Sequence, residues 1–131
     1  MVAEIWFMKT SCGFETLIIW KTFIEINKVI YDNIKPSDKI DWDLIRQTKR
    51  AMISVGLNIA EGYSRYHPKE KDQFLNIAIG SIQEVKACLL IIASLKPHAI
   101  SSEVIEKLID EIEILRRQII AFKMNIQNKK Q

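Results

Sequence analysis

The segment IEKLIDEIEILRRQIIAFKMNI, residues 105–126, decides the fold class of this 131-residue chain. Its apolar side chains recur at alternating steps of three and four positions: Ile105, Leu108, Ile112, Leu115, Ile119, Phe122 and Ile126. That spacing places them on one stripe of an α-helix, as in a heptad seam that packs against other helices. The sequence therefore predicts a long helix over about residues 102–127 that begins at Ser101 or Ser102.

Two segments in the first half of the chain also have helical patterns. The first spans about residues 14–34 and ends before Pro36, because proline disfavours helix in the residue ahead of it. The second spans about residues 41–62, and Gly62 is expected to close it in the left-handed conformation. Its candidate N-caps are Asp41, Ser37 and Asp38.

A fourth helical segment spans about residues 68–96, with Pro68 in its first turn and Pro97 beyond its end. The chain has only four glycines and three prolines, so its turns must be few. Short connections between four long helices make sequential helices antiparallel neighbours. We therefore expect an all-α protein, an antiparallel up-down-up-down four-helix bundle, in a single domain over residues 1–131.

The apolar positions also predict which side of each helix is buried. The second helix is expected to bury Trp42, Ile45, Met52, Ile59 and Tyr63, with Thr48 or Lys49 interrupting that side. The third is expected to bury Phe74, Leu75, Ala78, Ile82, Val85, Leu89 and Ile92. The first helix has apolar residues on more than one stripe, which indicates contact with another subunit.

Composition and motifs exclude several classes of function. The net charge of +3 is too mild to identify a nucleic acid as partner by itself. We find no phosphate-binding glycine loop, no GxSxG and no HExxH, and His67 and His98 lack metal-ligand spacing. We therefore expect no enzymatic activity, no metal and no cofactor. Cys88 lies in an apolar stretch and is expected to be a core thiol.

The longest nearly apolar run, Ala87 to Leu95, is far shorter than the roughly 18 residues of a membrane helix. The N-terminal residues lack the basic region of a secretory signal. We therefore expect a cytoplasmic protein with no membrane partner.

Small and polar residues stand in the middle of the second and third helices. Gly56 and Gly80 each lower helix stability by about 1 kcal/mol relative to alanine, so we expect these helices to cross closely there. Asn58, Glu61 and Glu84 stand among apolar neighbours, and carboxylates are rarely buried without partners. We expect a structural hydrogen-bond network; general acid–base work or a carboxylate metal site is the alternative. Arg50, Arg65 or backbone N–H groups are its candidate partners.

The last helix segregates its charges. Residues 103–113 hold five acids and one lysine, whereas residues 116–131 hold five bases and no acid. This order suits the helix dipole. The basic half is interpreted either as a solvated helix end or as a patch for phosphate.

These residues also carry a family signature. Residues 50–89 are RAMISVGLNIAEGYSRYHPKEKDQFLNIAIGSIQEVKACL, and they strongly resemble the bacterial four-helix-bundle family of 23S rRNA intervening-sequence proteins. The matching positions are Arg50, Ala51, Ser54, Asn58, Ile59, Ala60, Glu61, Gly62 and Arg65, then Phe74, Leu75, Ala78, Gly80, Ser81 and Glu84. Residues 95–103, LKPHAISSE, are similar to the accessory variability determinant proteins of diversity-generating retroelements.

The resemblance implies a non-enzymatic bundle that assembles as a homopentameric barrel. It implies a structural role for the motif residues Asn58, Glu61, Gly62, Gly80, Ser81 and Glu84. The retroelement relatives are basic barrels that bind nucleic acid and a partner reverse transcriptase.

Two hypotheses of function follow. The first is an oligomeric scaffold that binds RNA or DNA through Arg46, Lys49, Arg50, Arg65, Arg116, Arg117 and Lys123. Among these, Arg50 and Arg65 have the alternative role of partners for Glu61 or Glu84. The second is a protein-only adaptor that docks a polymerase or reverse transcriptase, and whose partner binding depends little on salt.

Overall fold

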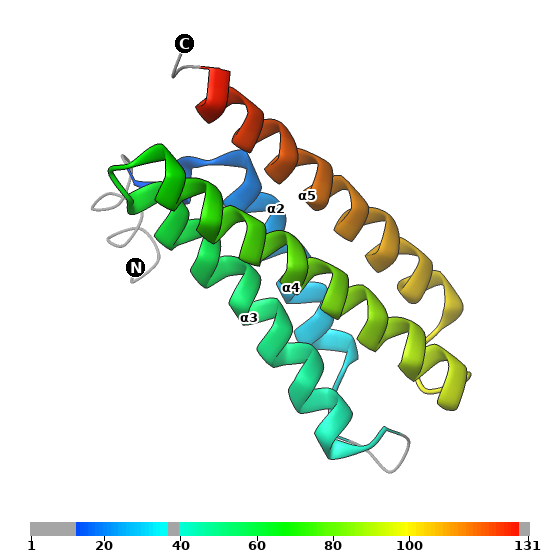
Figure 1. Ribbon diagram of the computed structural model, residues 1–131. Coiled ribbons are helices and arrows are strands. Elements are labelled where there is room, and N and C mark those ends of the chain that lie inside the picture. Colours follow the sequence, from blue (N-terminus) through cyan, green and yellow to red (C-terminus); the bar gives the residue numbers. More distant parts are fainter. Residues whose placement is uncertain (1–12, 37–39, 129–131) are drawn as a thin grey trace, which may run out of the picture.

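The computed structural model describes residues 13–36 and 40–128, which form four long helices and a short 3₁₀ turn (Figure 1). The elements are η1 (Phe14–Thr16), α2 (Ile18–Asn33), α3 (Trp42–Ser64), α4 (Pro68–Leu95) and α5 (Ser102–Asn128). The described residues contain no strand, so the all-α prediction is confirmed. The candidate N-caps Ser37 and Asp38 lie outside the described residues, and Asp41 occupies the N-cap position of α3.

The four helices lie side by side, with α3 and α4 sharing the most extensive contact (Figure 1). α4 also packs on α5, α5 on α2, and α2 on α3. Gln47 near the start of α3 meets Glu84, whereas Ser54, further along α3, meets Ser81. These two contacts show that α3 and α4 run in opposite directions.

The core is built from the apolar stripes that the sequence pattern predicts. Five seam residues of α5 are buried, and Phe122 and Ile126 are half-buried against the core. α4 buries all but one of its predicted positions, and Phe74 is half-buried. Pro68 stands in the first turn of α4, and the helix ends at Leu95 ahead of Pro97. The heptad seam and the buried side of α4 are therefore confirmed.

The first predicted helix is divided at Leu17, whose backbone is extended. After this break α2 buries Ile19, Phe23, Ile26 and Ile30. Much of its second apolar stripe packs against the chain's own core and is half-buried, namely Leu17, Trp20, Ile24 and Val29. That stripe is therefore covered largely within the chain, so it is weaker support for a subunit contact than the sequence suggested.

The buried side of α3 differs from the prediction at Trp42, and it is interrupted by the polar residue Thr48 as expected. Trp42 is the first residue of the helix and is 59% exposed, so its assignment to the core was wrong. Thr48 is fully buried, because its hydroxyl donates to the carbonyl of Leu44 at 2.7 Å and so has a partner. Ile45, Met52 and Ile59 are buried as predicted.

The glycines have different packing roles from those expected. A Cβ atom at Gly56 would overlap the ring of Phe23 on α2, so this glycine admits an α2 side chain rather than α4. Gly62 lies within α3, which continues to Ser64, and a Cβ atom there would lie 3.2 Å from the side chain of Leu75 on α4. Gly80 is exposed and has no atom within 4 Å of its Cβ position. α3 and α4 do approach closely in this region, where the Ser54 and Ser81 hydroxyl groups are 2.8 Å apart, but Gly56 and Gly80 do not provide the space for that approach. The expected left-handed closure at Gly62 was wrong.

Within residues 13–36 and 40–128, α4 is the one helix whose length and hydropathy reach those of a membrane span. Its most apolar window of 18 residues has a mean hydropathy of 1.6, and 39% of that window is buried. Core helices of water-soluble proteins also meet these criteria, and one side of α4 lies in the core of this fold.

Candidate nucleic-acid interface on α3

The seven basic residues predicted to bind nucleic acid lie in separate places. On α3 lie Arg46, Lys49 and Arg50, and at its C-terminal end lies Arg65. On α5 lie Arg116, Arg117 and Lys123. They do not form one continuous basic patch, and their charge partners differ. Each group is therefore described by itself.

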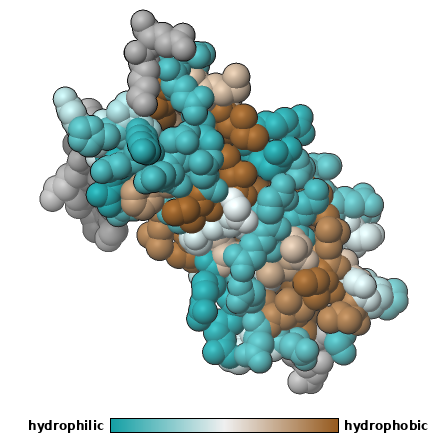
Figure 2. All heavy atoms as spheres, viewed as in Figure 1, coloured by the Kyte–Doolittle hydropathy of each residue, from teal (hydrophilic) through white to brown (hydrophobic). Residues whose placement is uncertain are grey.

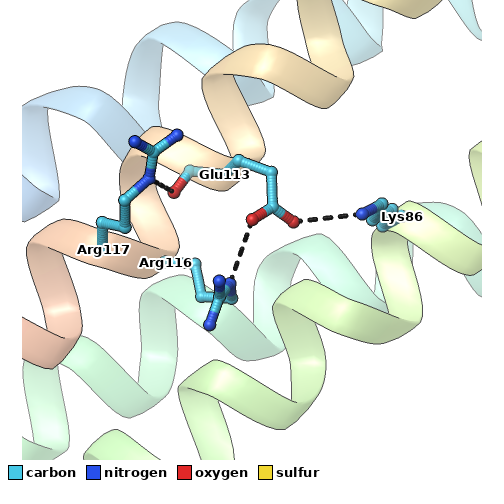
Figure 3. A network of polar contacts seen from close by, with 4 residues as sticks. All are labelled: Lys86, Glu113, Arg116 and Arg117. Atoms are coloured by element: carbon cyan, nitrogen blue, oxygen red, sulfur yellow. Dashed lines mark hydrogen bonds and ion pairs between the residues drawn. The ribbon is translucent and has the colours of Figure 1, made fainter.

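Two of the α5 bases belong to a charge network with α4 (Figure 3). Glu113 accepts hydrogen bonds from Lys86 at 3.2 Å and from Arg116 at 3.1 Å. Arg117 donates to the backbone carbonyl of Glu113 at 3.3 Å. The hydrogen bond from Lys86, followed by that from Arg116, lowers the pKa of the Glu113 carboxyl. The ion pair between Lys86 and Glu113 joins α4 to α5, whereas Arg116 and Arg117 bond to Glu113 within α5, so the charge of Arg116 is partly neutralised.

Lys123 also has carboxylate and amide partners within the bundle. Its ammonium lies 3.4 Å from Asp72 and bonds to Asn76, both on α4, and its side chain is only 18% exposed. Arg65 pairs with Glu61 at 2.9 Å, and its guanidinium lies 4.8 Å from the centre of the Phe74 ring. The role of Arg65 as the partner of Glu61 is thus confirmed.

The three remaining bases share the outer face of α3 with apolar side chains. We call this face the α3 surface. It borders a cavity of about 500 Å³, and its lining residues are Pro36, Trp42, Ile45, Arg46, Lys49, Arg50, Ile53, Ser54, Leu57 and Asn58. Three of these residues are cationic, and no described lining residue is acidic. The α3 surface is therefore suited to a polyanion.

The cations of the α3 surface are only weakly neutralised. Arg46 pairs with Asp43 at 2.8 Å, but both side chains are largely exposed, and such a pair contributes little. The Lys49 ammonium lies 4.4 Å from the centre of the Tyr31 ring, a contact that leaves its charge uncompensated. Arg50 is exposed and has no ion pair with any residue that the structure describes.

The sequence prediction missed the apolar part of this surface. Trp42 is 59% exposed, Leu57 is 62% exposed and Ile53 is 38% exposed. With Ile45, Met52 and Ile59 taken as the core side, a rotation of 100° per residue places Leu57 about 140° from the centre of that side, but Ile53 and Trp42 only about 100° and 80° from it. The periodicity therefore predicts an outward direction for Leu57 and leaves Trp42 and Ile53 at the edge of the core side.

The motif stretch of residues 50–89 spans most of α3 and most of α4, and it includes part of the α3 surface. A family model described as 23S rRNA-intervening sequence protein matches residues 15–121. The chain belongs to this family. A comparison with curated proteins gives no match.

The family's polar motif residues lie at the seam between α3 and α4. Asn58 donates to the carbonyl and hydroxyl oxygens of Ser54, at 2.8 and 3.2 Å, and the hydroxyl groups of Ser54 and Ser81 are 2.8 Å apart. Glu84 accepts a hydrogen bond from Gln47. Glu61 and Glu84 are exposed, so their expected burial among apolar neighbours was wrong. The hydrogen-bond network exists, but it lies near the surface.

The chemistry of the other candidate groups is limited. Cys88 is buried as expected, and this burial raises the pKa of its thiol and so disfavours the reactive thiolate. In the described parts of the chain, no cluster of three His, Cys, Asp or Glu side chains is arranged to hold a metal ion.

Proposed function

We propose that this member of the 23S rRNA-intervening sequence protein family is a non-enzymatic oligomeric scaffold that binds nucleic acid. Arg46, Lys49 and Arg50 on the α3 surface carry this function. The supporting observation is that three weakly neutralised cations line one surface with no acidic residue among its described lining. Such cations displace counterions from phosphates, which is the main electrostatic source of nucleic-acid affinity.

The other four predicted bases are given a structural role in this proposal. Arg65, Arg116 and Lys123 already pair with Glu61, Glu113 and Asp72. Arg117 donates to a backbone carbonyl within its own helix. A phosphate would have to displace these partners, whereas on the α3 surface Arg46 alone has an acidic partner among the described residues, the exposed Asp43.

Self-association is the second part of the proposal, and α4 supports it. Gly80, Ala87 and Ser94 are exposed and seven residues apart, so they form one narrow stripe on the outside of the helix. Leu90 and Ile91 beside them are nearly half exposed. Figure 2 shows hydrophobic side chains gathered over the C-terminal half of α4. A glycine in the middle of a helix lowers stability by about 1 kcal/mol relative to alanine. Close approach of another subunit's helix would explain why Gly80 is present despite this cost.

The proposed assembly is a homopentamer of antiparallel up-down-up-down bundles, with its stoichiometry taken from the family resemblance. At +3 per chain, five copies carry a formal charge of +15. This charge supports attraction of a polyanion over the whole particle. We place the assembly in the cytoplasm, without a cofactor.

A protein-only adaptor is the second candidate, and the apolar part of the α3 surface favours it. Exposed Trp42, Ile53 and Leu57 resemble the hydrophobic centre of a protein interface. In that case a polymerase or reverse transcriptase would be the partner, and its binding would change little with salt.

The test is a salt titration of binding to a labelled RNA and a labelled DNA duplex. Changing Arg46, Lys49 and Arg50 together to Ser is expected to weaken binding and to reduce the slope of log K against log salt by about two to three. The matched control changes Lys28, Lys69 and Lys107 to Ser, which removes the same charge from exposed positions elsewhere. Equal effects of the two triple variants would contradict the assignment to the α3 surface.

A further inference from the structure

We infer that the α3 surface takes single-stranded rather than duplex nucleic acid, with the indole of Trp42 stacking on an unpaired base. This inference rests on the proposed function, because it requires the cations of the α3 surface to bind phosphate. To the proposed function it adds that the nucleic acid is single-stranded and that Trp42 is the residue that distinguishes a single strand from a duplex.

Trp42 is available for stacking in a way that the other described tryptophan is not. Trp20 packs against the rings of Phe14 and Phe23, with centroids 4.6 and 5.1 Å away. Trp42 has no aromatic partner among the described residues and is 59% exposed. It lines two cavities, the one on the α3 surface and one of about 670 Å³ toward Ile91 and the end of α4. Space for a flat ligand group therefore adjoins the indole.

The cations follow Trp42 along the same side of the helix. Arg46 lies one turn after Trp42, and Lys49 and Arg50 lie one turn further. The four residues span roughly 12 Å along the helix axis at 1.5 Å per residue. A row of cations that begins at an exposed aromatic ring suits a single strand, whose phosphates meet the cations while a base stacks on the ring.

A duplex fits this arrangement less well. Its bases are already stacked and paired inside, so only grooves and phosphates face a protein surface. The indole would then meet sugar and phosphate, where its ring gains no stacking partner. The cations alone would bind a duplex, and Trp42 would contribute nothing to the affinity.

The far end of the α3 surface also suits an exposed base. The Asn58 amide nitrogen donates to Ser54, which fixes the side chain, and its carbonyl oxygen has no hydrogen-bond partner within the described residues. Because Asn58 lines the cavity, this oxygen is placed to accept a hydrogen bond from the amino group of an unpaired base. Leu57 beside it offers an apolar contact for the base's face.

The experiment compares a labelled 12-nucleotide RNA with the 12-base-pair duplex of the same sequence, using the full chain. We expect the single strand to bind about tenfold more tightly. Trp42→Leu, which keeps an apolar side chain but removes the ring, should lower single-strand affinity by about tenfold and leave duplex affinity unchanged. Trp42→Phe should retain most of the affinity, since it retains a ring. The matched control is Tyr66→Leu, which removes a ring that is 89% exposed and lies beyond the end of α3.

Two results would overturn the inference. Equal binding of both RNAs, with Trp42→Leu changing neither affinity, would show that the α3 surface contacts only phosphates. The proposed function would still hold in that case if the Arg46, Lys49 and Arg50 variant loses binding. Tighter binding of an acidic amphipathic helical peptide than of either RNA would assign the surface to a protein. Circular dichroism of each variant confirms that the helices are retained.

Discussion

The ring of Phe23 on α2 occupies the space that a Cβ atom would need at Gly56 on α3. Phe23 is 4% exposed, and its ring also contacts that of Trp20 at 5.1 Å between centroids. The glycine therefore allows α2 and α3 to approach with an aromatic ring between them. This contact fixes the α2 side of the fold, and it explains a glycine in the interior of a long helix.

Gly56→Ala is expected to destabilise the fold, even though alanine is the better helix former. The added methyl group must displace the Phe23 ring within a packed core, and such overpacking usually costs about 1–3 kcal/mol. Chemical denaturation followed by circular dichroism measures the effect. A variant as stable as the parent chain would show that the ring has room to move.

Gly80→Ala is the matched substitution at an open position, and it should act in the opposite direction. Nothing lies within 4 Å of the Cβ position, so the gain in helix propensity, up to about 1 kcal/mol, should appear as added stability of the isolated chain. A loss of stability in a dilute, monomeric sample would contradict this reasoning.

Gly80→Leu tests self-association separately from folding. A bulky side chain on the small-residue stripe should block close approach of a second helix and reduce the oligomeric mass measured by light scattering after size exclusion. Lys107→Leu is the control, because Lys107 is also exposed but lies on α5 rather than on the α4 stripe. If both variants assemble like the parent chain, the stripe is not the subunit contact.

Glu113→Gln is expected to lower stability by about 1 kcal/mol at pH 7, since Lys86 and Arg116 lose a charged partner. Because the pKa of Glu113 is lowered from its ordinary 4.5, its contribution is present above that value and is lost as the pH falls through the lowered pKa. Melting temperatures of the two proteins should therefore converge in acid. A difference that stays constant down to pH 2 would exclude Glu113 as its source.

Cys88 should react slowly with a thiol reagent at pH 8 in a chain that carries Cys12→Ser. Burial raises the pKa of the thiol and shields it, so modification should need opening of the bundle. Addition of urea should accelerate the reaction steeply. Rapid modification in native buffer would contradict the burial of this side chain.

Much of the fold follows from helical periodicity. The seam of α5 and the buried side of α4 were predictable because each has one repeating apolar stripe. Trp42 was misassigned because hydrophobicity alone says nothing of which way the first residue of a helix points. Gly56 and Gly80 look equivalent in sequence, but the ring of Phe23 on α2 fills the space at Gly56, whereas nothing lies near Gly80.

The candidate site was only partly predictable for a related reason. All seven bases look equally available in the sequence, but four of them have acidic partners. Arg46, Arg65 and Arg116 pair within one helix, whereas the partner of Lys123 depends on tertiary packing. Lys123, for example, meets Asp72, which lies 51 residues away in the chain. Periodicity cannot show such pairings. The three bases of the α3 surface remain available because Lys49 and Arg50 have no ion pair with a described residue and the Arg46–Asp43 pair is largely exposed.

The measurement that tests the central claim most directly is the salt dependence of nucleic-acid binding by the parent chain and by the Arg46, Lys49 and Arg50 to Ser variant. We predict that the parent binds tightly at low salt, and that its affinity falls steeply with salt. The variant should bind more weakly and with a shallower slope. Identical slopes for the two proteins, or no binding by a folded parent chain, would contradict a nucleic-acid role for the α3 surface.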